Sequence, residues 1–161
     1  MYDGTVETFE KLKRPNTAVV MATVGNNILI QEQEQPGKPG PFFSLPGGRI
    51  EEGEKAIDAA KRELLEETGY ASSDWELWKA FSPFSKTIWT VYTYIARNCE
   101  KKAEQALDAG EKILPKLISF EEFLMLSENE TFYEYKLVPF LYKFRLHPDE
   151  KEKFRELMFR K

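Results

Sequence analysis

The stretch from Gly48 to Tyr70 (GRIEEGEKAIDAAKRELLEETGY) constrains this chain more than any other part of it. It holds seven acidic residues and four basic ones. Three apolar residues within it, Ile57, Ala60 and Leu64, recur at the spacing of one helix face. We therefore predict a helix over residues 56–68 that buries this apolar face against a sheet, which would hold the acidic side chains in place.

Three of the acidic residues, Glu63, Glu66 and Glu67, follow one another at i, i+3 and i+4. In a helix they project from the same side, and like charges at this spacing weaken a helix by about 0.2–0.5 kcal/mol per pair. A divalent cation removes the conflict, and hard carboxylate oxygens suit Mg²⁺ or Mn²⁺. The alternative interpretation is a solvated charged face that binds nothing.

Residues around this acidic face favour the first interpretation. Pro46-Gly47-Gly48 brings backbone without bulky side chains close to the acidic segment, so the carbonyl of Gly47 can face the same space. Arg62 can pair with Glu54 and hold the loop against the helix. A metal bound there would bridge phosphate oxygens and acidify a water molecule. The predicted reaction class is metal-assisted hydrolysis of a phosphoanhydride.

The same stretch carries a spaced pattern: Gly, five residues, Glu, seven residues, then Arg-Glu-aliphatic-any-Glu-Glu-any-Gly and a bulky residue. Only Tyr70 departs from it, being aromatic where an aliphatic residue is commoner. This pattern resembles the signature of the Nudix hydrolase family. The resemblance implies a mixed sheet between helices, bound Mg²⁺ or Mn²⁺, and cleavage of a nucleoside diphosphate linked to another moiety.

Outside the signature, the chain resembles the ADP-ribose pyrophosphatase branch over most of residues 6–126, including Ser44–Gly48 (SLPGG) and Asp108–Ile113 (DAGEKI). That branch hydrolyses ADP-ribose to AMP and ribose 5-phosphate and completes its site with a late acidic residue. Glu111 is the candidate for this ligand or general base, ahead of Asp108, and the alternative is that Glu111 is an ordinary loop acid.

The resemblance assigns site residues by position. The candidate metal ligands are Gly47, Glu63, Glu66, Glu67 and Glu111, and the candidate catalytic residues are Glu54, Arg62, Glu66 and Glu111. For substrate contacts we name Arg14 and Arg49, because arginine binds phosphate with a bidentate fork, and Phe84, which could stack on a base. The alternatives are surface charges for the two arginines and a core or rim position for Phe84.

Three departures from the branch leave other substrates open. Gln35 stands where many members have an arginine before a proline, only about fifteen residues precede the core, and Pro83 comes slightly early. The alternatives are another nucleoside diphosphate sugar such as GDP-mannose, a modified nucleotide, or a nucleotide-sensing domain that does not catalyse.

Composition sets broader limits. The length of 161 residues fits one domain, and the net charge of −4 argues against nucleic acid as a partner. We expect no signal peptide, because polar and acidic residues follow Met1, and no membrane span, because the longest apolar run is too short. One cysteine, Cys99, cannot form an internal disulfide, which favours the cytoplasm. A homodimer is expected from the resemblance alone.

The remaining pattern predicts an α+β domain in which a mixed sheet lies between helices, in an α/β/α layered arrangement. Residues 1–15 should form an N-terminal arm or edge strand, and residues 134–161 the C-terminal helices. Strands are predicted at 17–24, 27–33, 42–45, 75–81, 89–97 and 113–119, and helices at 56–68, 120–126, 134–145 and 148–160.

Overall fold

A mixed β-sheet of seven strands forms the centre of the structure, a computed structural model that describes residues 3–160. Its strands are β2 (Thr17–Val24), β3 (Asn27–Glu34), β4 (Phe42–Ser44), β5 (Gly47–Arg49), β7 (Asp74–Phe81), β9 (Val91–Arg97) and β11 (Lys112–Ser119). The main order is β11-β3-β2-β9-β7, with β4 paired to β3 and β5 paired to β2. Only the β2–β9 pair is parallel within this sheet.

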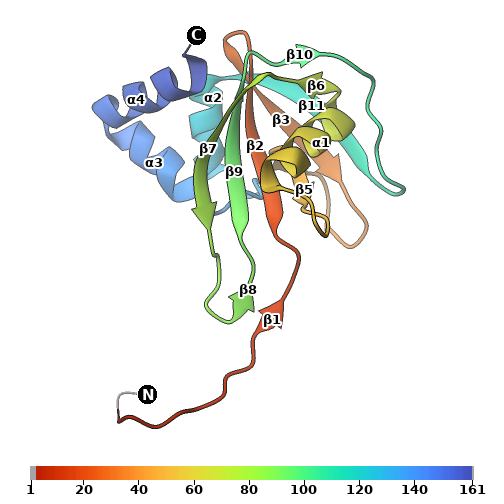
Figure 1. The fold of residues 1–161 in the computed structure, drawn as a ribbon. Helices are drawn as coiled ribbons and strands as arrows, with labels where there is room; N and C mark the ends of the chain where they lie inside the picture. Colours follow the sequence, from red (N-terminus) through yellow and green to blue (C-terminus); the bar gives the residue numbers. More distant parts are fainter. Residues whose placement is uncertain (1–2, 161) are drawn as a thin grey trace.

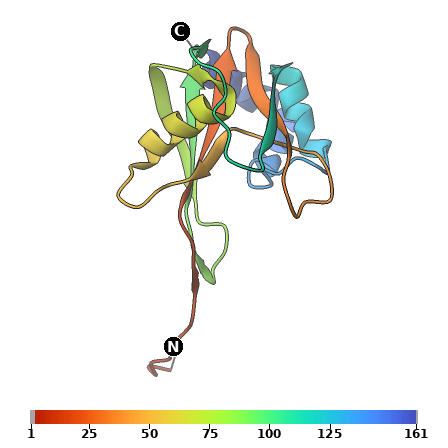
Figure 2. The ribbon, with the colours of Figure 1, turned by 90° about the vertical axis from the view of Figure 1, so that its right-hand side faces the viewer.

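Helices cover both faces of the sheet, as the sequence predicted (Figure 1). Helix α1 (Ala56–Thr68) lies on one face. The other face carries α2 (Phe120–Met125), the short 3₁₀ helix η1 (Leu126–Glu128), α3 (Val138–Leu146) and α4 (Pro148–Phe159). Figure 2 shows the same layers from the side. None of the helices in the described part of the chain has the length and apolar composition that a bilayer span requires.

Strand β2 explains how one sheet supports two cores. Its residues alternate: Ala18 and Val20 pack in the core beneath α1, while Val19 and Met21 pack in the core beneath the C-terminal helices. Because successive side chains of a strand point to opposite faces, a strand buried on both faces needs a continuous apolar run, which Thr17–Val24 supplies.

Several elements end where the sequence predicted and others do not. Strand β2 and helix α1 have the predicted bounds, and Gly69 adopts the left-handed conformation with φ 73° that ends α1. The helix expected from Glu134 begins instead at Val138, because Pro139 must lie in a first helical turn. Strand β5 was not predicted, since its two glycines disfavour strands in isolation.

Two short ribbons lie outside the main sheet. The first pairs β1 (Leu12–Lys13) with β8 (Thr87–Ile88) in parallel, and the second pairs β6 (Tyr70–Ala71) with β10 (Glu100–Lys101) in antiparallel fashion. The N-terminal residues from 3 to 11 form no strand and extend away from the sheet (Figures 1 and 2). The arm expected from the sequence is therefore present, with pairing limited to two residues; residues 1, 2 and 161 lie outside the described part.

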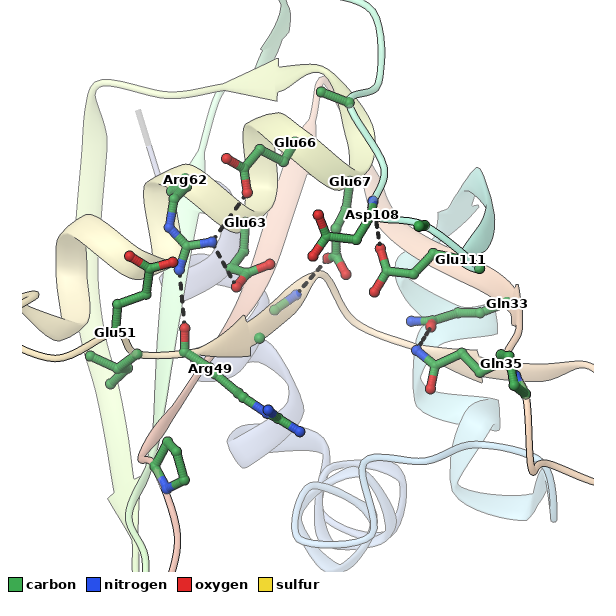
Figure 3. Close-up of a pocket in the computed structure, with 18 of the residues that line it drawn as sticks. Gln33, Gln35, Arg49, Glu51, Arg62, Glu63, Glu66, Glu67, Asp108 and Glu111 are labelled. Carbon is green, nitrogen blue, oxygen red and sulfur yellow. Dashed lines mark hydrogen bonds and ion pairs between the residues drawn. The ribbon is translucent and has the colours of Figure 1, made fainter.

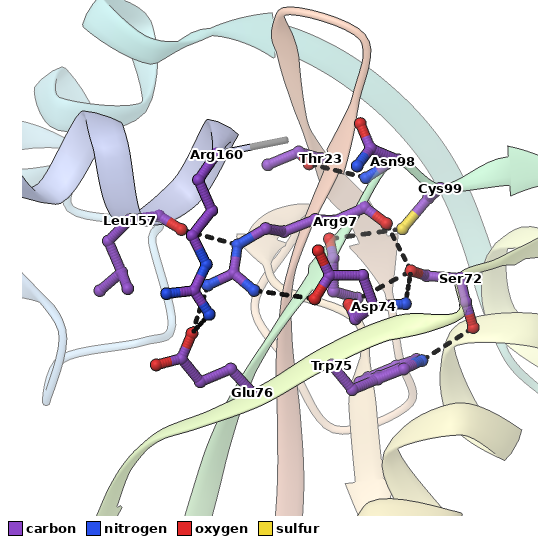
Figure 4. A network of polar contacts seen from close by, with 11 residues as sticks. Thr23, Ser72, Asp74, Trp75, Glu76, Arg97, Asn98, Cys99, Leu157 and Arg160 are labelled. Atoms are coloured by element: carbon purple, nitrogen blue, oxygen red, sulfur yellow. Dashed lines mark hydrogen bonds and ion pairs between the residues drawn. The ribbon is translucent and has the colours of Figure 1, made fainter.

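Arg97 is a charged residue buried inside this fold (Figure 4). Its guanidinium pairs with Asp74 at 3.0 Å and with Glu76 on the neighbouring strand β7, and its Nε donates to the carbonyl of Leu157 in α4 at 2.7 Å. Arg160 also binds Glu76, at 2.7 Å. The network fastens the last helix to the edge of the sheet.

Replacing Arg97 with methionine should lower the free energy of unfolding by about 1–3 kcal/mol, because the carbonyl of Leu157 loses its donor, whereas Asp74 and Glu76 are partly exposed and can be solvated. Urea titration followed by circular dichroism measures this. The control is Lys143→Met, which removes an exposed pair with Glu150 and should cost about 0.5 kcal/mol. Equal losses in the two variants would contradict the role given to Arg97.

Candidate active site

A cavity of about 680 Å³, here called the carboxylate pocket, lies beside the polar face of α1 (Figure 3). Two arginines, Arg49 and Arg62, line it together with seven acidic residues: Glu51, Glu52, Glu63, Glu66, Glu67, Asp108 and Glu111. A polyphosphate entering this space would be repelled by the acidic residues unless cations accompanied it. The pocket therefore combines a strong demand for cations with room for a small molecule.

Arg62 organises one side of the pocket. Its Nε and one terminal nitrogen hold both oxygens of Glu54, at 3.0 and 3.1 Å, and its other terminal nitrogen binds Glu63 at 2.9 Å and Glu66 at 3.1 Å. It also donates to the carbonyl of Arg49 at 3.0 Å. The predicted Arg62–Glu54 pair is confirmed, and the arginine lowers the pKa of Glu54 mainly through that hydrogen bond.

Glu67 lies deepest in the pocket and has little exposed surface. One of its oxygens, Oε2, accepts two hydrogen bonds, from the Gln31 side chain at 2.9 Å and from the backbone N–H of Gly47 at 2.8 Å. The other oxygen, Oε1, receives no hydrogen bond from the residues that the structure describes. Burial raises the pKa of Glu67 to about 8, because the charged form is poorly solvated there.

The glycines before α1 allow this close packing. A Cβ atom at Gly48 would stand 2.2 Å from Oε1 of Glu63, and one at Gly47 would stand 2.3 Å from the carbonyl oxygen of Ala18. Gly47 also has a φ of 156°, which disfavours other residues. A side chain at position 48 would displace the Glu63 carboxylate from its present position, whereas a side chain at position 47 would clash with the backbone of β2.

The segment after β10 brings the late acid into the same pocket. Its backbone and side chains cap the carbonyls at the end of α1: Ala106 donates to Glu66 at 2.8 Å and Gln105 to Glu67 at 2.6 Å. The chain then passes Asp108 and turns at Glu111, whose carboxylate lies across the pocket from Arg62 (Figure 3). The expected proximity of Glu111 to the helical acids is thus found, and no helical turn forms in this segment.

The donor set fits a hard divalent cation. Burial raises the pKa of Glu63, although Arg62 opposes the shift, and the Oε1 of Glu67 is an oxygen donor without a hydrogen bond from the described residues, on a carboxylate that Gln31 and Gly47 hold in place. Within residues 3–160, no three acidic, histidine or cysteine side chains are already gathered around one point. Two of the helical carboxylates instead face Arg62, so binding a cation requires side-chain rotations.

A Nudix-domain family model matches residues 12–141 of the chain. The chain belongs to the Nudix family. It is a Nudix hydrolase, a class that generally uses divalent metal ions and acts on small nucleoside diphosphate compounds. The resemblance inferred from the signature is therefore confirmed, and the helical acids and Arg62 occupy the positions that this signature requires.

Two relatives from bacilli cover most of the chain. The "Methanol dehydrogenase activator" of Bacillus methanolicus is 30% identical over 141 residues, which are 84% of this chain and 75% of that protein. The "ADP-ribose pyrophosphatase" of Bacillus subtilis is 30% identical over 142 residues, covering 83% of this chain and 74% of that protein.

A solved structure shares the fold. It is titled "Crystal structure of ADP compounds hydrolase" and superposes with a TM-score of 0.73 at 20% identity, covering 89% of this chain and 78% of that one. At this identity the likeness establishes the arrangement of sheet and helices, in agreement with the layered α+β fold predicted from the sequence.

The three predicted substrate contacts lie in different places. Arg49 lines the carboxylate pocket. Arg14 lines an adjoining cavity, with its guanidinium 4.0 Å from the ring centre of Trp89. Phe84 stacks on Trp89 with ring centres 6.2 Å apart and lines neither cavity. The structure therefore does not bring Phe84 to the helical acids.

Two glutamines of the site escaped the sequence interpretation. Gln31 positions the oxygen of Glu67, and Gln105 ties the end of α1 to β11 by donating also to the carbonyl of Ile113 at 3.1 Å. Gln31 is fully buried in the structure and a buried amide needs a partner, but β3 holds four other polar residues, so its sequence does not single out Gln31.

Replacing Glu67 with glutamine should stabilise the metal-free protein at alkaline pH. A carboxyl whose folded pKa is raised from 4.5 to about 8 makes the protein less stable as the pH rises through that interval, because unfolding releases the proton. Glutamine keeps an oxygen for both donors and carries no charge. The variant's advantage in unfolding free energy should grow by at least about 1.4 kcal/mol between pH 5 and pH 9.

Urea titrations in the presence of a chelator at both pH values measure this difference. Added Mg²⁺ at pH 8 should then stabilise the unaltered protein and have little effect on the variant, because only a protein that binds the ion gains stability. Parallel stability curves for the two proteins at both pH values would contradict this account of Glu67.

Proposed function

We propose that this Nudix hydrolase acts as one domain and cleaves ADP-ribose to AMP and ribose 5-phosphate. The observation that carries the proposal is the continuity of two cavities. The carboxylate pocket and the adjoining cavity that contains Arg14 share Gln33, Gln35 and Gly47. A diphosphate among the acids therefore has space beside it for a nucleoside. The relative named ADP-ribose pyrophosphatase supports the choice of substrate.

In this proposal the helical acids Glu63, Glu66 and Glu67, with the carbonyl of Gly47, hold Mg²⁺ or Mn²⁺. When bound, the ion offsets the charge of the diphosphate and acidifies a coordinated water. Glu54 anchors Arg62, which bonds to Glu63 and Glu66, and these two carboxylates would rotate away from Arg62 to reach the ion. The N–H of Gly47 fixes Glu67 so that Oε1 is presented to the pocket.

Glu111 is proposed as the proton acceptor. It forms no ion pair with the described residues, and only the backbone N–H of Asp108 donates to it, at 3.3 Å. Its carboxylate can therefore take a proton from a water molecule as the water oxygen bonds to phosphorus and the bond to the bridging oxygen breaks. The products are two phosphate monoesters and one proton, which buffer finally takes up.

The test is a product assay with purified protein. ADP-ribose, GDP-mannose, UDP-glucose, NADH and a panel of nucleoside triphosphates are incubated with and without Mg²⁺ or Mn²⁺, and products are separated by chromatography. We expect AMP and ribose 5-phosphate from ADP-ribose only when a metal is present. Glu67→Gln should lower kcat/KM more than about 100-fold, and Glu111→Ala should lower kcat by about 10²–10⁴-fold.

Asp149→Asn is the matched control, because this acid lies in the first turn of α4 on the other face of the sheet. Faster turnover of another compound than of ADP-ribose would overturn the choice of substrate. A Glu111→Ala variant with unchanged kcat would remove Glu111 from the mechanism.

We also infer that the protein forms a homodimer through its N-terminal arm. Val6 and Phe9 are 93% and 71% exposed and Leu12 is 70% exposed, so the arm carries apolar side chains that nothing in the described chain covers. Light scattering after size-exclusion chromatography should give about twice the 18.8 kDa of the chain. Val6→Ser with Phe9→Ser should give a monomer. A monomeric unaltered protein would exclude the dimer.

A cytoplasmic location remains a prediction based on the single cysteine. Cys99 is buried and its thiol contacts the carbonyl oxygen of Ala96 at 3.5 Å. Cell fractionation with an antibody to the protein tests this prediction, and recovery outside the cytosolic fraction would contradict it.

A further inference from the structure

The cavity next to the carboxylate pocket, here called the aromatic pocket, has a volume of about 320 Å³. Four aromatic side chains line it: Phe42, Trp89, Tyr133 and Tyr135. Neighbouring rings are in contact, with centres 4.9 Å apart for Phe42 and Tyr133 and 5.6 Å apart for Tyr133 and Tyr135. Flat apolar walls of this kind suit a planar group rather than a sugar, which needs several hydrogen-bond partners.

Backbone hydrogen bonds fix the segment that contributes Tyr133 and Glu134 to the lining of the aromatic pocket. The segment before α3 runs parallel to β4: Phe43 donates to the carbonyl of Thr131 at 3.0 Å, and Tyr133 donates to the carbonyl of Phe43 at 2.8 Å. Tyr133 and Glu134 are thereby fixed beside the strand that leads to Gly47. The position of Glu134 is set by main-chain bonds and not by a freely moving loop.

Three cationic side chains, Arg14, Lys38 and Lys136, line the aromatic pocket, and none of them forms an ion pair with Glu134; two of these cations lie over its rings. The guanidinium of Arg14 lies over Trp89, and the ammonium of Lys38 lies 3.8 Å from the ring centre of Tyr133 and bonds to its hydroxyl. Both cations are free of ion pairs with the described residues, so they remain able to face a substrate phosphate at the junction with the carboxylate pocket.

Glu134 is the only acidic residue among the described residues that line the aromatic pocket. It takes part in no ion pair within the described chain, and the one group that donates to its carboxylate is the backbone N–H of Leu45. Desolvation raises the pKa of Glu134 to about 7 in spite of that bond. A poorly solvated carboxyl without a charged partner, set in an aromatic cavity, has capacity to accept further hydrogen bonds.

We propose that the aromatic pocket receives the nucleobase of the substrate and that Glu134 selects a base with an exocyclic amino group, as on adenine. This inference rests on the proposed function for the diphosphate, but its binding partner is the base alone. A carboxylate accepts hydrogen bonds and cannot donate them. An amino group at the edge of the base therefore satisfies Glu134, whereas a carbonyl in its place puts two acceptors face to face.

The test compares adenine with hypoxanthine, which carries a carbonyl where adenine carries the amino group. Calorimetry measures the binding of AMP and IMP at pH 8.5, where Glu134 is ionised, to the full chain with Mg²⁺ present. The unaltered protein should bind AMP about 5- to 150-fold more tightly than IMP. Glu134→Gln, which offers both a donor and an acceptor, should reduce this preference to below about threefold.

Kinetics provide a second readout. With ADP-ribose and its inosine analogue, Glu134→Gln should bring the two KM values closer together, whereas the ratio of the two kcat values should change less than about twofold, because the base is not the reacting group. Glu130→Gln is the matched control, because Glu130 is exposed, lies four residues earlier and lines neither pocket. It should behave as the unaltered protein does.

Tyr135→Ala keeps the proposal testable if Glu134→Gln fails to fold, because Tyr135 is 57% exposed and tolerates truncation. Loss of a stacking surface should weaken AMP and IMP alike, by about 5-fold or more. Equal affinity of the unaltered protein for AMP and IMP, or a preference that Glu134→Gln leaves intact, would overturn the proposal. A clear AMP preference without turnover of ADP-ribose would support the base pocket and refute the proposed reaction.

Discussion

The close approach of α1 to the sheet is the constraint on which the site depends. Small side chains make this contact: Ala59 and Ala60 of the helix face Ala18, Ala22 and Ala96 of the sheet, and all five are fully buried. Larger residues would hold the helix farther from the strands. Because the helix lies so close, Glu67 on its side reaches both Gln31 in β3 and the backbone of Gly47 in β5. Hydrophobic packing thus positions an acid in a place where acids are unfavourable.

That unfavourable position is what the proposed cation would relieve. A carboxylate costs free energy when it is desolvated near others of like charge, and Glu63 and Glu67 both show this through raised pKa values. Arg62 relieves part of the conflict on one side of the helix, where it bonds to Glu54, Glu63 and Glu66 together. The remainder is left on Glu67, at the centre of the pocket. Packing of the core therefore holds Glu67 in a poorly solvated position, and the proposed divalent ion would compensate for this cost.

Features of the fold that depend on a single local residue pattern could be predicted from the sequence. The bounds of α1 followed from Ile57, Ala60 and Leu64 together with Gly69, and those of β2 from an apolar run that only a strand buried on both faces requires. The pairing of Arg62 with Glu54 followed from their places in the signature. In these cases the local signal and the tertiary structure agree, so nothing beyond the segment itself was needed.

The residues that escaped prediction depend on pairing between distant segments. In the sequence, Arg97 is only the last residue of an ordinary strand. In the structure it contacts Asp74, Glu76 and the carbonyl of Leu157. The sequence placed Glu134 in a helix. In the structure Phe43 pairs with the segment before Glu134, and the helix begins only at Val138, with Pro139 in its first turn. Neither environment has a local sequence signal, because the partners are supplied by separate elements of the fold.

The departure at Gln35 shows how such pairing bears on the substrate. Gln35 donates to Gln33 at 2.9 Å, and both line the junction of the two pockets, where an arginine would have met a phosphate. Arg14 and Lys38 supply positive charge near this junction, where they lie over the rings of Trp89 and Tyr133. Cations held over rings of the aromatic pocket can act on a phosphate only if the nucleoside lies against those rings. In the proposed complex, recognition of the base and recognition of the diphosphate are therefore linked through these contacts between rings and cations, whereas an arginine at position 35 would separate the two.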